Sequence, residues 1–247
     1  MRSCGDKRYP VLLIGESSRL DCAGKWGEAM LITSVVAPMF ATNCWVIASG
    51  PGQECIIVDP GMPDISHEVS SLISEHGLKP VAALITHGHL DHTFSVKPLA
   101  DGYGIASYIH TEDRDLLLKP QGAHGAEFIA TLDAMTFEEP SEVKNLRHGD
   151  QIDLLDMKIT AIHSPGHTRG SVMFIINDEL LLTGDVLFAG SIGRTDLPSG
   201  SHDAMQKTLK TRVLPLNDDL RVLPGHGPET TIKFERKNNP YLKELRS

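Results

Sequence analysis

The stretch Thr86-His-Gly-His-Leu-Asp-His92 decides the fold, and it directly follows the apolar run Val81-Ala-Ala-Leu-Ile85. An apolar run of this length predicts a buried strand. The histidine-rich stretch therefore lies on a loop at a strand end, where concave sites commonly form. Gly88 allows a tight bend inside the loop. We interpret the stretch as the centre of a metal site.

Four side chains of this loop are candidate ligands, and their spacing divides them into two pairs. We expect His87 and His89 to converge on one ion, while Asp91 and His92, one turn later, face a neighbouring ion. Neutral imidazoles and carboxylates suit zinc, and a set without cysteine favours a hydrolytic over a structural site. A solvated, histidine-rich loop is the alternative interpretation.

Three further segments supply one candidate ligand each. Each segment is a glycine-marked turn beside a predicted strand. The candidates are His167, Asp185 and His226, in the segments His163-Ser-Pro-Gly-His-Thr-Arg-Gly-Ser171, Thr183-Gly-Asp-Val-Leu-Phe188 and Leu223-Pro-Gly-His-Gly227.

Composition restricts the class of partner. The chain has 247 residues, of which 40% are hydrophobic and 22% charged, as in an ordinary globular protein. Its net charge of −9, without a Lys/Arg-rich run, argues against a nucleic-acid or membrane partner and favours a small-molecule substrate. No apolar run approaches a transmembrane length, and the cysteines lack the spacing of a disulfide scaffold, so we expect a cytoplasmic protein. The cysteines are Cys4, Cys22, Cys44 and Cys55.

Residues 1–29 show no sustained periodicity, and we expect a loose extension there, with Met30 as a candidate natural start. Residues 30–247 are predicted to form one domain of mixed α and β class, in which two sheets pack together with helices outside. Strands are expected at 44–48, 54–58, 81–85, 152–162, 172–176, 180–182 and 221–224, a turn at 155–157, and helices at 64–76, 202–214 and 231–242.

Together with Val58-Asp-Pro-Gly61, these motifs resemble those of the metallo-β-lactamase superfamily over nearly the whole chain from Met30. The resemblance implies an αββα sandwich with the site at the open edge between the sheets. It also implies two divalent metal ions, with zinc expected and iron or manganese as alternatives. The first ion would be held by His87, His89 and His167 and the second by Asp91, His92 and His226, with Asp185 bridging them.

Within the superfamily, the chain is most similar to the glyoxalase II-like branch, through the motifs already quoted and Ser191-Ile-Gly-Arg-Thr-Asp196. This similarity implies hydrolysis of a 2-hydroxyacyl thioester such as S-lactoylglutathione by a hydroxide. Asp91 and Asp185 are the expected catalytic residues, because they can orient the hydroxide and carry its proton. The segment after His226 is too short for the helical domain with which larger glyoxalase II enzymes hold glutathione, so the thiol carrier stays open.

Other functions remain as alternatives. A persulfide dioxygenase with one iron would use His87, His167 and Asp185, a two-histidine, one-carboxylate set. A non-catalytic binding or scaffold module would be expected to lose ligands, whereas this chain has the full set. Asp91 disfavours a β-lactamase, and the net charge disfavours a nuclease.

The remaining polar candidates are weaker. Asp59 is expected to orient the histidine loop through hydrogen bonds, with a plain turn role as the alternative. Arg194 is a candidate substrate anchor, with an ion pair to Asp196 as the alternative. Residues 119–140 either cover the pocket or form a surface connection. No site is assigned to His110, His124, His148 and His202, which are expected at the surface or at helix ends. His163 is expected to be a strand residue, with support of a metal ligand as the alternative.

Overall fold

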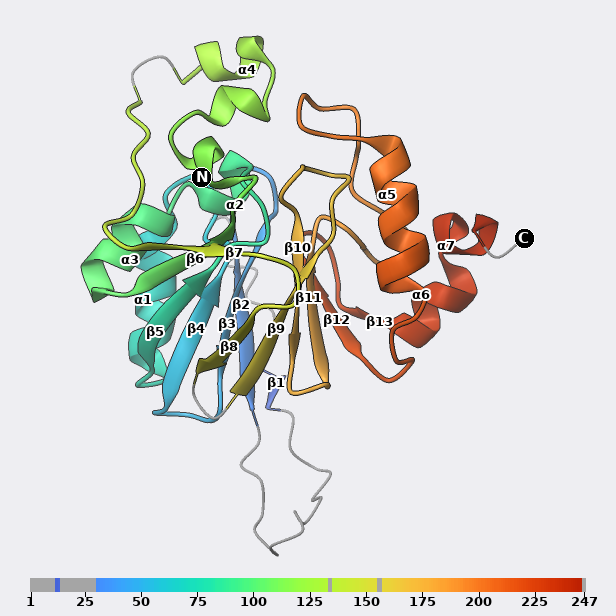
Figure 1. Ribbon diagram of the computed structural model, residues 1–247. Helices are drawn as coiled ribbons and strands as arrows, with labels where there is room; N and C mark the ends of the chain where they lie inside the picture. The colour runs from blue at the N-terminus through green and yellow to red at the C-terminus, as the bar shows by residue number, and fades with distance from the viewer. Residues whose placement is uncertain (1–11, 14–29, 133–134, 155–156, 246–247) are drawn as a thin grey trace, which may run out of the picture.

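A computed structural model describes residues 12–13, 30–132, 135–154 and 157–245. Two sheets form its centre, and each follows the order of the sequence (Figure 1). The first sheet contains β1 (Leu12–Leu13), β2 (Leu31–Val36), β3 (Asn43–Ala48), β4 (Glu54–Val58), β5 (Lys79–Leu84), β6 (Ala106–His110) and β7 (Val143–Leu146). The second contains β8 (Gln151–Leu154), β9 (Met157–His163), β10 (Val172–Ile176), β11 (Leu180–Gly184), β12 (Arg221–Pro224) and β13 (Thr230–Thr231).

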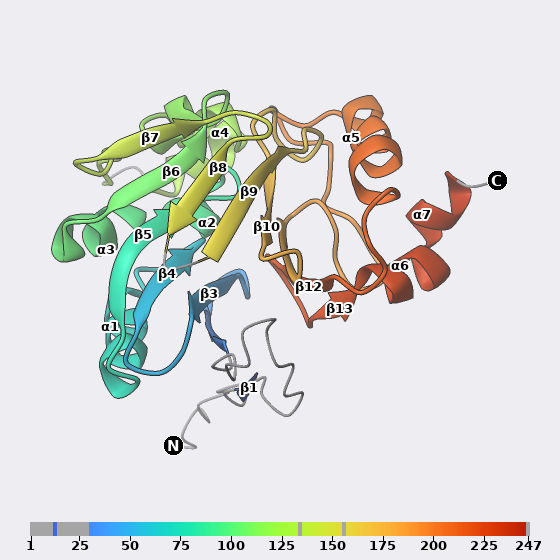
Figure 2. The same ribbon diagram turned by 60° about the horizontal axis from the view of Figure 1, so that its bottom comes forward.

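Helices cover the outer face of each sheet (Figures 1 and 2). On the first sheet they are α1 (Ser66–Glu75), α2 (Leu90–Thr93) and α3 (Val96–Tyr103), followed at one end by η1 (Arg114–Leu117), η2 (Pro120–Gly122) and α4 (Ala126–Ala130). On the second sheet they are α5 (His202–Thr208), which continues as the π-helical turn η3 (Leu209–Val213), and then α6 (Ile232–Asn238) and α7 (Pro240–Glu244).

Alternation along β3 shows why four layers form. Val46 and Ile47 are both fully buried, but Val46 packs toward Val69 of α1, whereas Ile47 belongs to the core between the sheets with Phe174 of β10. Successive side chains of a strand point to opposite faces, so each face of the first sheet has its own core. A third core lies between the second sheet and helices α5 and α6, around Leu209. The predicted αββα sandwich is therefore confirmed.

The functional loops leave one edge of this sandwich. β5 ends at Leu84, directly before the histidine stretch, and β11 ends at Gly184, directly before Asp185. β12 runs parallel to β11, so it delivers His226 to the same edge. Trp45 of β3 donates a hydrogen bond from Nε1 to Pro224 O at 3.0 Å and so connects the two sheets beside this loop.

Most expected elements are present. The strands predicted at 44–48 and 54–58 are present as β3 and β4 and pair in an antiparallel register that sets Trp45 opposite Val58. The strands predicted at 172–176 and 221–224 have those bounds. The single helix predicted over 231–242 is wrong, because Asn239 is extended before Pro240 and caps a second helix there.

Two expectations fall largely outside the described residues. They are the loose extension at 1–29 and the turn at 155–157, although Leu12–Leu13 of the extension pairs with β2. None of the described helices is long and apolar enough to cross a membrane.

Candidate metal centre

Three buried histidines from two loops form the first group of the site. His87 and His89 follow β5, and His167 lies between β9 and β10. Their ligand atoms all lie within 4.8 Å of one another, and His89 Nδ1 is 2.7 Å from His167 Nε2. The first predicted set is therefore brought together, at the edge where both loops meet.

Asp91, His92 and His226 form the second group. α2 begins directly after His89, so Asp91 and His92 lie in its first turn. His92 Nε2 is 3.3 Å from His226 Nε2 and 3.5 Å from Asp91 Oδ2, and His226 Nε2 is 3.4 Å from the same oxygen. A short helix thus aims two neighbouring side chains at a histidine more than a hundred residues away in sequence.

Asp185 lies between the two groups. Its Oδ2 is 3.5 Å from His167 Nε2 of the first group and 3.4 Å from His226 Nε2 of the second. Its Oδ1 is 3.4 Å from His92 Nε2. A Cβ at Gly225 would come within 2.4 Å of that Oδ1, so the loop after β12 approaches Asp185 closely only because residue 225 has no side chain.

Hydrogen bonds to the outer ring nitrogens turn three imidazoles inward. His167 Nδ1 donates to the carbonyl oxygen of Arg194 at 2.7 Å, and His92 Nδ1 donates to Asp59 Oδ2 at 3.0 Å. Thr86 Oγ1 lies 3.0 Å from His87 Nδ1. Because each outer nitrogen has a partner, the Nε2 lone pairs remain available on the site side.

Asp59 organises the start of the histidine loop. It accepts the backbone N–H of Thr86 at 2.8 Å and the Thr86 hydroxyl at 2.6 Å, in addition to the bond from His92. Its backbone has a φ of 50°, a left-handed conformation that is uncommon outside glycine, asparagine and aspartate and that is concentrated at functional sites. The orienting contacts expected of Asp59 are all present.

The donor set fits metal ions. Ligand atoms bound at 2.0–2.1 Å to a tetrahedral zinc ion are about 3.3 Å apart, which is close to the 3.3–3.5 Å separations around Asp185 and His226. Buried atoms without a hydrogen-bond partner lie in the same place, and a metal ion would satisfy them. Among the described side chains these include His87 Nε2 and Asp185 Oδ1.

The field in the site also favours cations. Burial lowers the pKa of His92, but Asp185 and Asp91 outweigh burial and raise the pKa to about 9. The same two carboxylates raise the pKa of His226 to about 10 against the effect of burial. In the first group, burial and the neighbouring histidines keep the pKa of His87 well below its usual value, so this imidazole is neutral and able to act as a ligand.

Residues 37–226 match the family model of the metallo-beta-lactamase superfamily. The chain belongs to the metallo-β-lactamase superfamily. An uncharacterized protein of Mycobacterium leprae is 42% identical over 219 residues, which cover 87% of this chain and 100% of that protein. Hydroxyacylglutathione hydrolase GloC of Haemophilus influenzae is 33% identical over 215 residues, which cover 86% of this chain and 98% of that protein.

Solved structures agree with this membership. The crystal structure of the BLEG-1 B3 metallo-beta-lactamase has a TM-score of 0.77 and 32% identity, covering 85% of this chain and 99% of that one. A protein crystallised in a di-iron-bound form has a TM-score of 0.68 and 32% identity over the same shares. The chain is therefore a metallo-hydrolase superfamily member with a metal-binding His/Asp cluster.

Asp113 is a site residue of this metallo-β-lactamase fold that the sequence pattern did not reveal. It is completely buried beside η1 and holds both histidine loops of the first group through hydrogen bonds. No motif marks it, because its partners are mainly backbone N–H groups. Gly88 was expected to provide a tight bend, but its importance is close packing: a Cβ there would lie 2.6 Å from Leu116 Cβ.

The expected position at the surface or at a helix end is wrong for His110, which is buried in β6, whereas His124 does lie between η2 and α4 but beside the ligand groups. The His124 ring is 4.8 Å from that of His89, and its Nε2 accepts the backbone N–H of Leu90 at 3.0 Å. His110 is 5% exposed and stacks on His163 with ring centroids 3.9 Å apart. Neither has a sequence neighbour at ligand spacing, which is why the pattern missed them.

Arg194 contributes to the site through its backbone. Its carbonyl oxygen accepts the hydrogen bond from His167, whereas its guanidinium makes two 2.8 Å hydrogen bonds to Asp196. Both side chains of this ion pair are more than half exposed. The ion pair that the sequence left as an alternative is thus present.

Proposed function

We propose that this protein is a metal-dependent thioester hydrolase acting on 2-hydroxyacyl thioesters such as S-lactoylglutathione. The observation that supports it best is the place of Asp185, within 3.5 Å of His92, His167 and His226 and so between two complete ligand groups. Two adjacent ions sharing a carboxylate are suited to hydrolysis of an acyl bond. The match to a hydroxyacylglutathione hydrolase supports the acyl and thiol classes.

Two divalent ions would be held by these residues, with zinc proposed and iron or manganese as alternatives. His87, His89 and His167 would hold one and Asp91, His92 and His226 the other, with Asp185 shared. When bound, such ions polarise a carbonyl group and lower the pKa of water to about 7. Cysteine is absent from both groups, as expected for a site that keeps coordination positions open to substrate.

Asp91 is the side chain best placed to move a proton. Its carboxylate is 15% exposed, whereas that of Asp185, the other carboxylate of the site, is 9% exposed. Thr42 donates a hydrogen bond from Oγ1 to Asp91 Oδ2 at 3.3 Å and so restrains the carboxylate. We assign to Asp91 the orientation of the attacking water and the transfer of its proton to the departing sulfur.

The site suits a substrate whose leaving group needs no proton, as in a thioester. The water oxygen bonds to the acyl carbon, the carbon–sulfur bond breaks, and the products are a carboxylic acid and a thiol. A thiolate leaves without prior protonation, so a separate general acid is unnecessary. Beside Asp91 and Asp185, the third carboxylate of the described site is that of Asp59, and it is already used by Thr86 and His92.

Thiol release tests the proposal. Purified protein, chelator-treated protein and protein reloaded with zinc, manganese or iron would be compared for thiol production from S-lactoylglutathione. We expect turnover to disappear on chelation, to return with metal, and to fall at least about 100-fold in Asp91→Asn. A β-lactam should not be hydrolysed at a comparable rate. β-Lactam hydrolysis without thioester hydrolysis would overturn the assignment, and so would turnover that is unaffected by chelation.

A further inference from the structure

A row of aromatic rings leads from the metal centre to the surface. The centroid of the His124 ring is 4.8 Å from that of His89 and 5.1 Å from that of Phe128. Phe128 in turn meets Phe40 edge to face at 5.9 Å. We call Phe40, Phe128 and His124 the aromatic row. It continues outward from a histidine of the first ligand group, so its inner end is adjacent to the reaction site.

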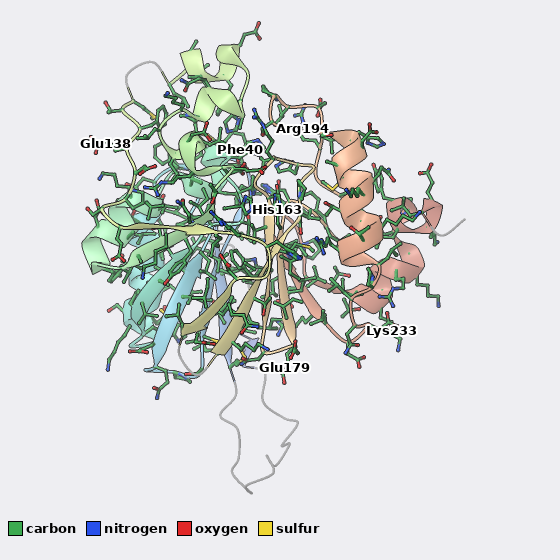
Figure 3. The ribbon with its side chains drawn as sticks, in the orientation of Figure 1. Phe40, Glu138, His163, Glu179, Arg194 and Lys233 are labelled. Atoms are coloured by element: carbon green, nitrogen blue, oxygen red, sulfur yellow. The ribbon has the colours of Figure 1, made fainter. Side chains whose placement is uncertain are left out.

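The outer end of the row is exposed. Phe40 is 40% exposed, and its neighbour Met39 is 57% exposed. Figure 3 shows Phe40 at the same end of the sandwich as Arg194 and far from Glu179. Exposed apolar side chains that form a contiguous patch rimmed by polar residues can mark a ligand site, whereas a single exposed one carries no such meaning.

The loop that carries Phe40 is fastened to the second ligand group. Thr42 forms a β-bridge with His226, and the backbone N–H of Asn43 donates to Gly225 O at 2.7 Å. Asn43 Nδ2 also donates to Pro224 O and Gly227 O. The row therefore begins beside His89 of the first group, and the backbone of the loop that bears Phe40 is bonded to the segment that carries His226 of the second group.

Two arginines on the flanking segments are held in ion pairs. The guanidinium of Arg194 pairs with Asp196, and that of Arg114 in η1 pairs with Glu139 at 2.9 Å. The chain as a whole carries a net charge of −9. The row thus offers ring faces and apolar edges, which recognise apolar or aromatic groups rather than carboxylates.

We propose that the aromatic row binds an apolar substituent of the thioester substrate, an inference that rests on the proposed function. The substituent lies next to the reacting carbonyl, against Phe128 and Phe40, with His124 forming the inner wall. Phe40 and Phe128 are accordingly specificity-determining residues. The preferred substrate has a larger apolar group than the methyl of a lactoyl unit, on either its acyl or its thiol side.

Two pairs of substrates separate the acyl side from the thiol side. The acyl pair is S-lactoylglutathione and S-mandeloylglutathione, which differ only in methyl against phenyl. The thiol pair is the lactoyl thioesters of 2-hydroxyethanethiol and benzyl mercaptan. We expect kcat/KM to favour the phenyl-bearing member at least about tenfold in one pair, a typical gain for filling an apolar pocket. A ratio near one in both pairs would overturn the proposal.

Variants connect the preference to the row. In the pair that shows the preference, Phe40→Ala and Phe128→Ser should each lower the ratio of kcat/KM for the phenyl-bearing substrate to kcat/KM for its partner at least about fivefold. Phe128→Leu should retain more of this ratio because leucine stays apolar. Phe234→Ala on α6 is the matched control, because Phe234 is 54% exposed and lies outside the row. An equal loss in the control, or an unchanged ratio in Phe40→Ala, would contradict the inference.

A binding measurement keeps this test separate from the proposed function. The benzyl thioether in which the carbonyl is replaced by a methylene cannot be hydrolysed, and its binding to untreated and chelator-treated protein can be followed by calorimetry. Phe40→Ala should weaken binding at least about fivefold in both forms. If no thioester is hydrolysed, the proposed function fails, and the binding measurement alone tests whether the aromatic row binds an apolar group. An unchanged affinity in Phe40→Ala would then overturn the inference about the row.

Discussion

The carboxylate of Asp113 accepts the backbone N–H of Gly88 at 2.9 Å, and so fixes the centre of the histidine loop from a residue 25 positions later. The same carboxylate accepts the backbone N–H of Gly170 at 2.7 Å and the hydroxyl of Thr168 at 2.6 Å. Burial raises the pKa of Asp113, and these three bonds oppose the rise. One buried side chain thus holds together the two loops that carry the first ligand group.

Asp113→Asn should loosen the first metal group. An asparagine presents an N–H to at least one of the N–H groups that Asp113 now accepts, which leaves a buried donor without a partner. We expect metal affinity to fall about 10- to 100-fold, as for other groups that orient ligands. Competition with a chelator measures it. Asp153→Asn, at an exposed position of β8, is the control, and equal affinities in the two variants would refute the role.

His226→Ala should affect mainly the second group. His226 has contacts with Asp91 and Asp185, whereas the first group keeps His87, His89 and His167. Bound metal is expected to fall from two ions per chain toward one, with at least a tenfold loss of turnover. Elemental analysis of the dialysed variant gives the number of metal ions bound per chain. Two retained ions, or full turnover with one, would argue against a second group built around His226.

Gly225→Ala should disturb the bridging carboxylate without unfolding the chain. Its new Cβ would lie 2.4 Å from Asp185 Oδ1 and 2.7 Å from His92 Cε1, so at least one of these side chains must move. We predict a loss of turnover of at least about tenfold, because small displacements in a site cost that much. Thermal melting, compared with that of Gly102→Ala in open space, separates a local effect from unfolding. Wild-type turnover would show that the close approach is unimportant.

The stacked pair His110 and His163 predicts a pH dependence of stability. Burial, and then His163, lower the pKa of His110 to about 4, whereas the unfolded value is about 6.5. The unfolded chain therefore binds this proton first on acidification. The stabilising effect of neutral His110 is full above about pH 6.5 and is lost as the pH falls toward 4.

Urea unfolding at pH 7.5 and pH 5 tests this dependence. His110→Phe retains a ring for stacking but cannot titrate, so its free energy of unfolding should fall less between the two pH values than that of the wild type. The difference between the proteins isolates His110 from the titrating groups of the metal site. Equal losses in both proteins would show that His110 does not contribute.

Regular hydrophobic periodicity made the sandwich predictable. Most of the features that the sequence did not predict lie in irregular segments. The strand 172–176 was predicted with its observed bounds because its residues form an unbroken apolar run between turns. Asp113 acts through backbone groups of residues 25 and 57 positions away, which no local pattern records. Phe40 and His124 lie outside strands and α-helices, and their proximity depends on how the loops fold over the sheet edge.

The candidate ligands could be predicted as a set because each follows a strand end, and parallel strands such as β11 and β12 deliver them to one edge. Their roles as metal ligands, the zinc content and the cytoplasmic location stay predictions. The role of Arg194 shows why side chains outside the motif were harder to interpret. Its sequence neighbourhood was noticed, but only the structure shows that its carbonyl, rather than its guanidinium, meets His167.

Metal stoichiometry measured together with product formation is the most direct test of a two-metal thioester hydrolase. Protein isolated without added metal would be analysed for zinc, iron and manganese, and the same sample assayed for thiol release and for oxygen uptake with a persulfide. The account predicts about two divalent ions per chain, thiol release that rises with metal content, and no oxygen uptake. One iron per chain with oxygen uptake and sulfite formation would contradict it and identify a persulfide dioxygenase.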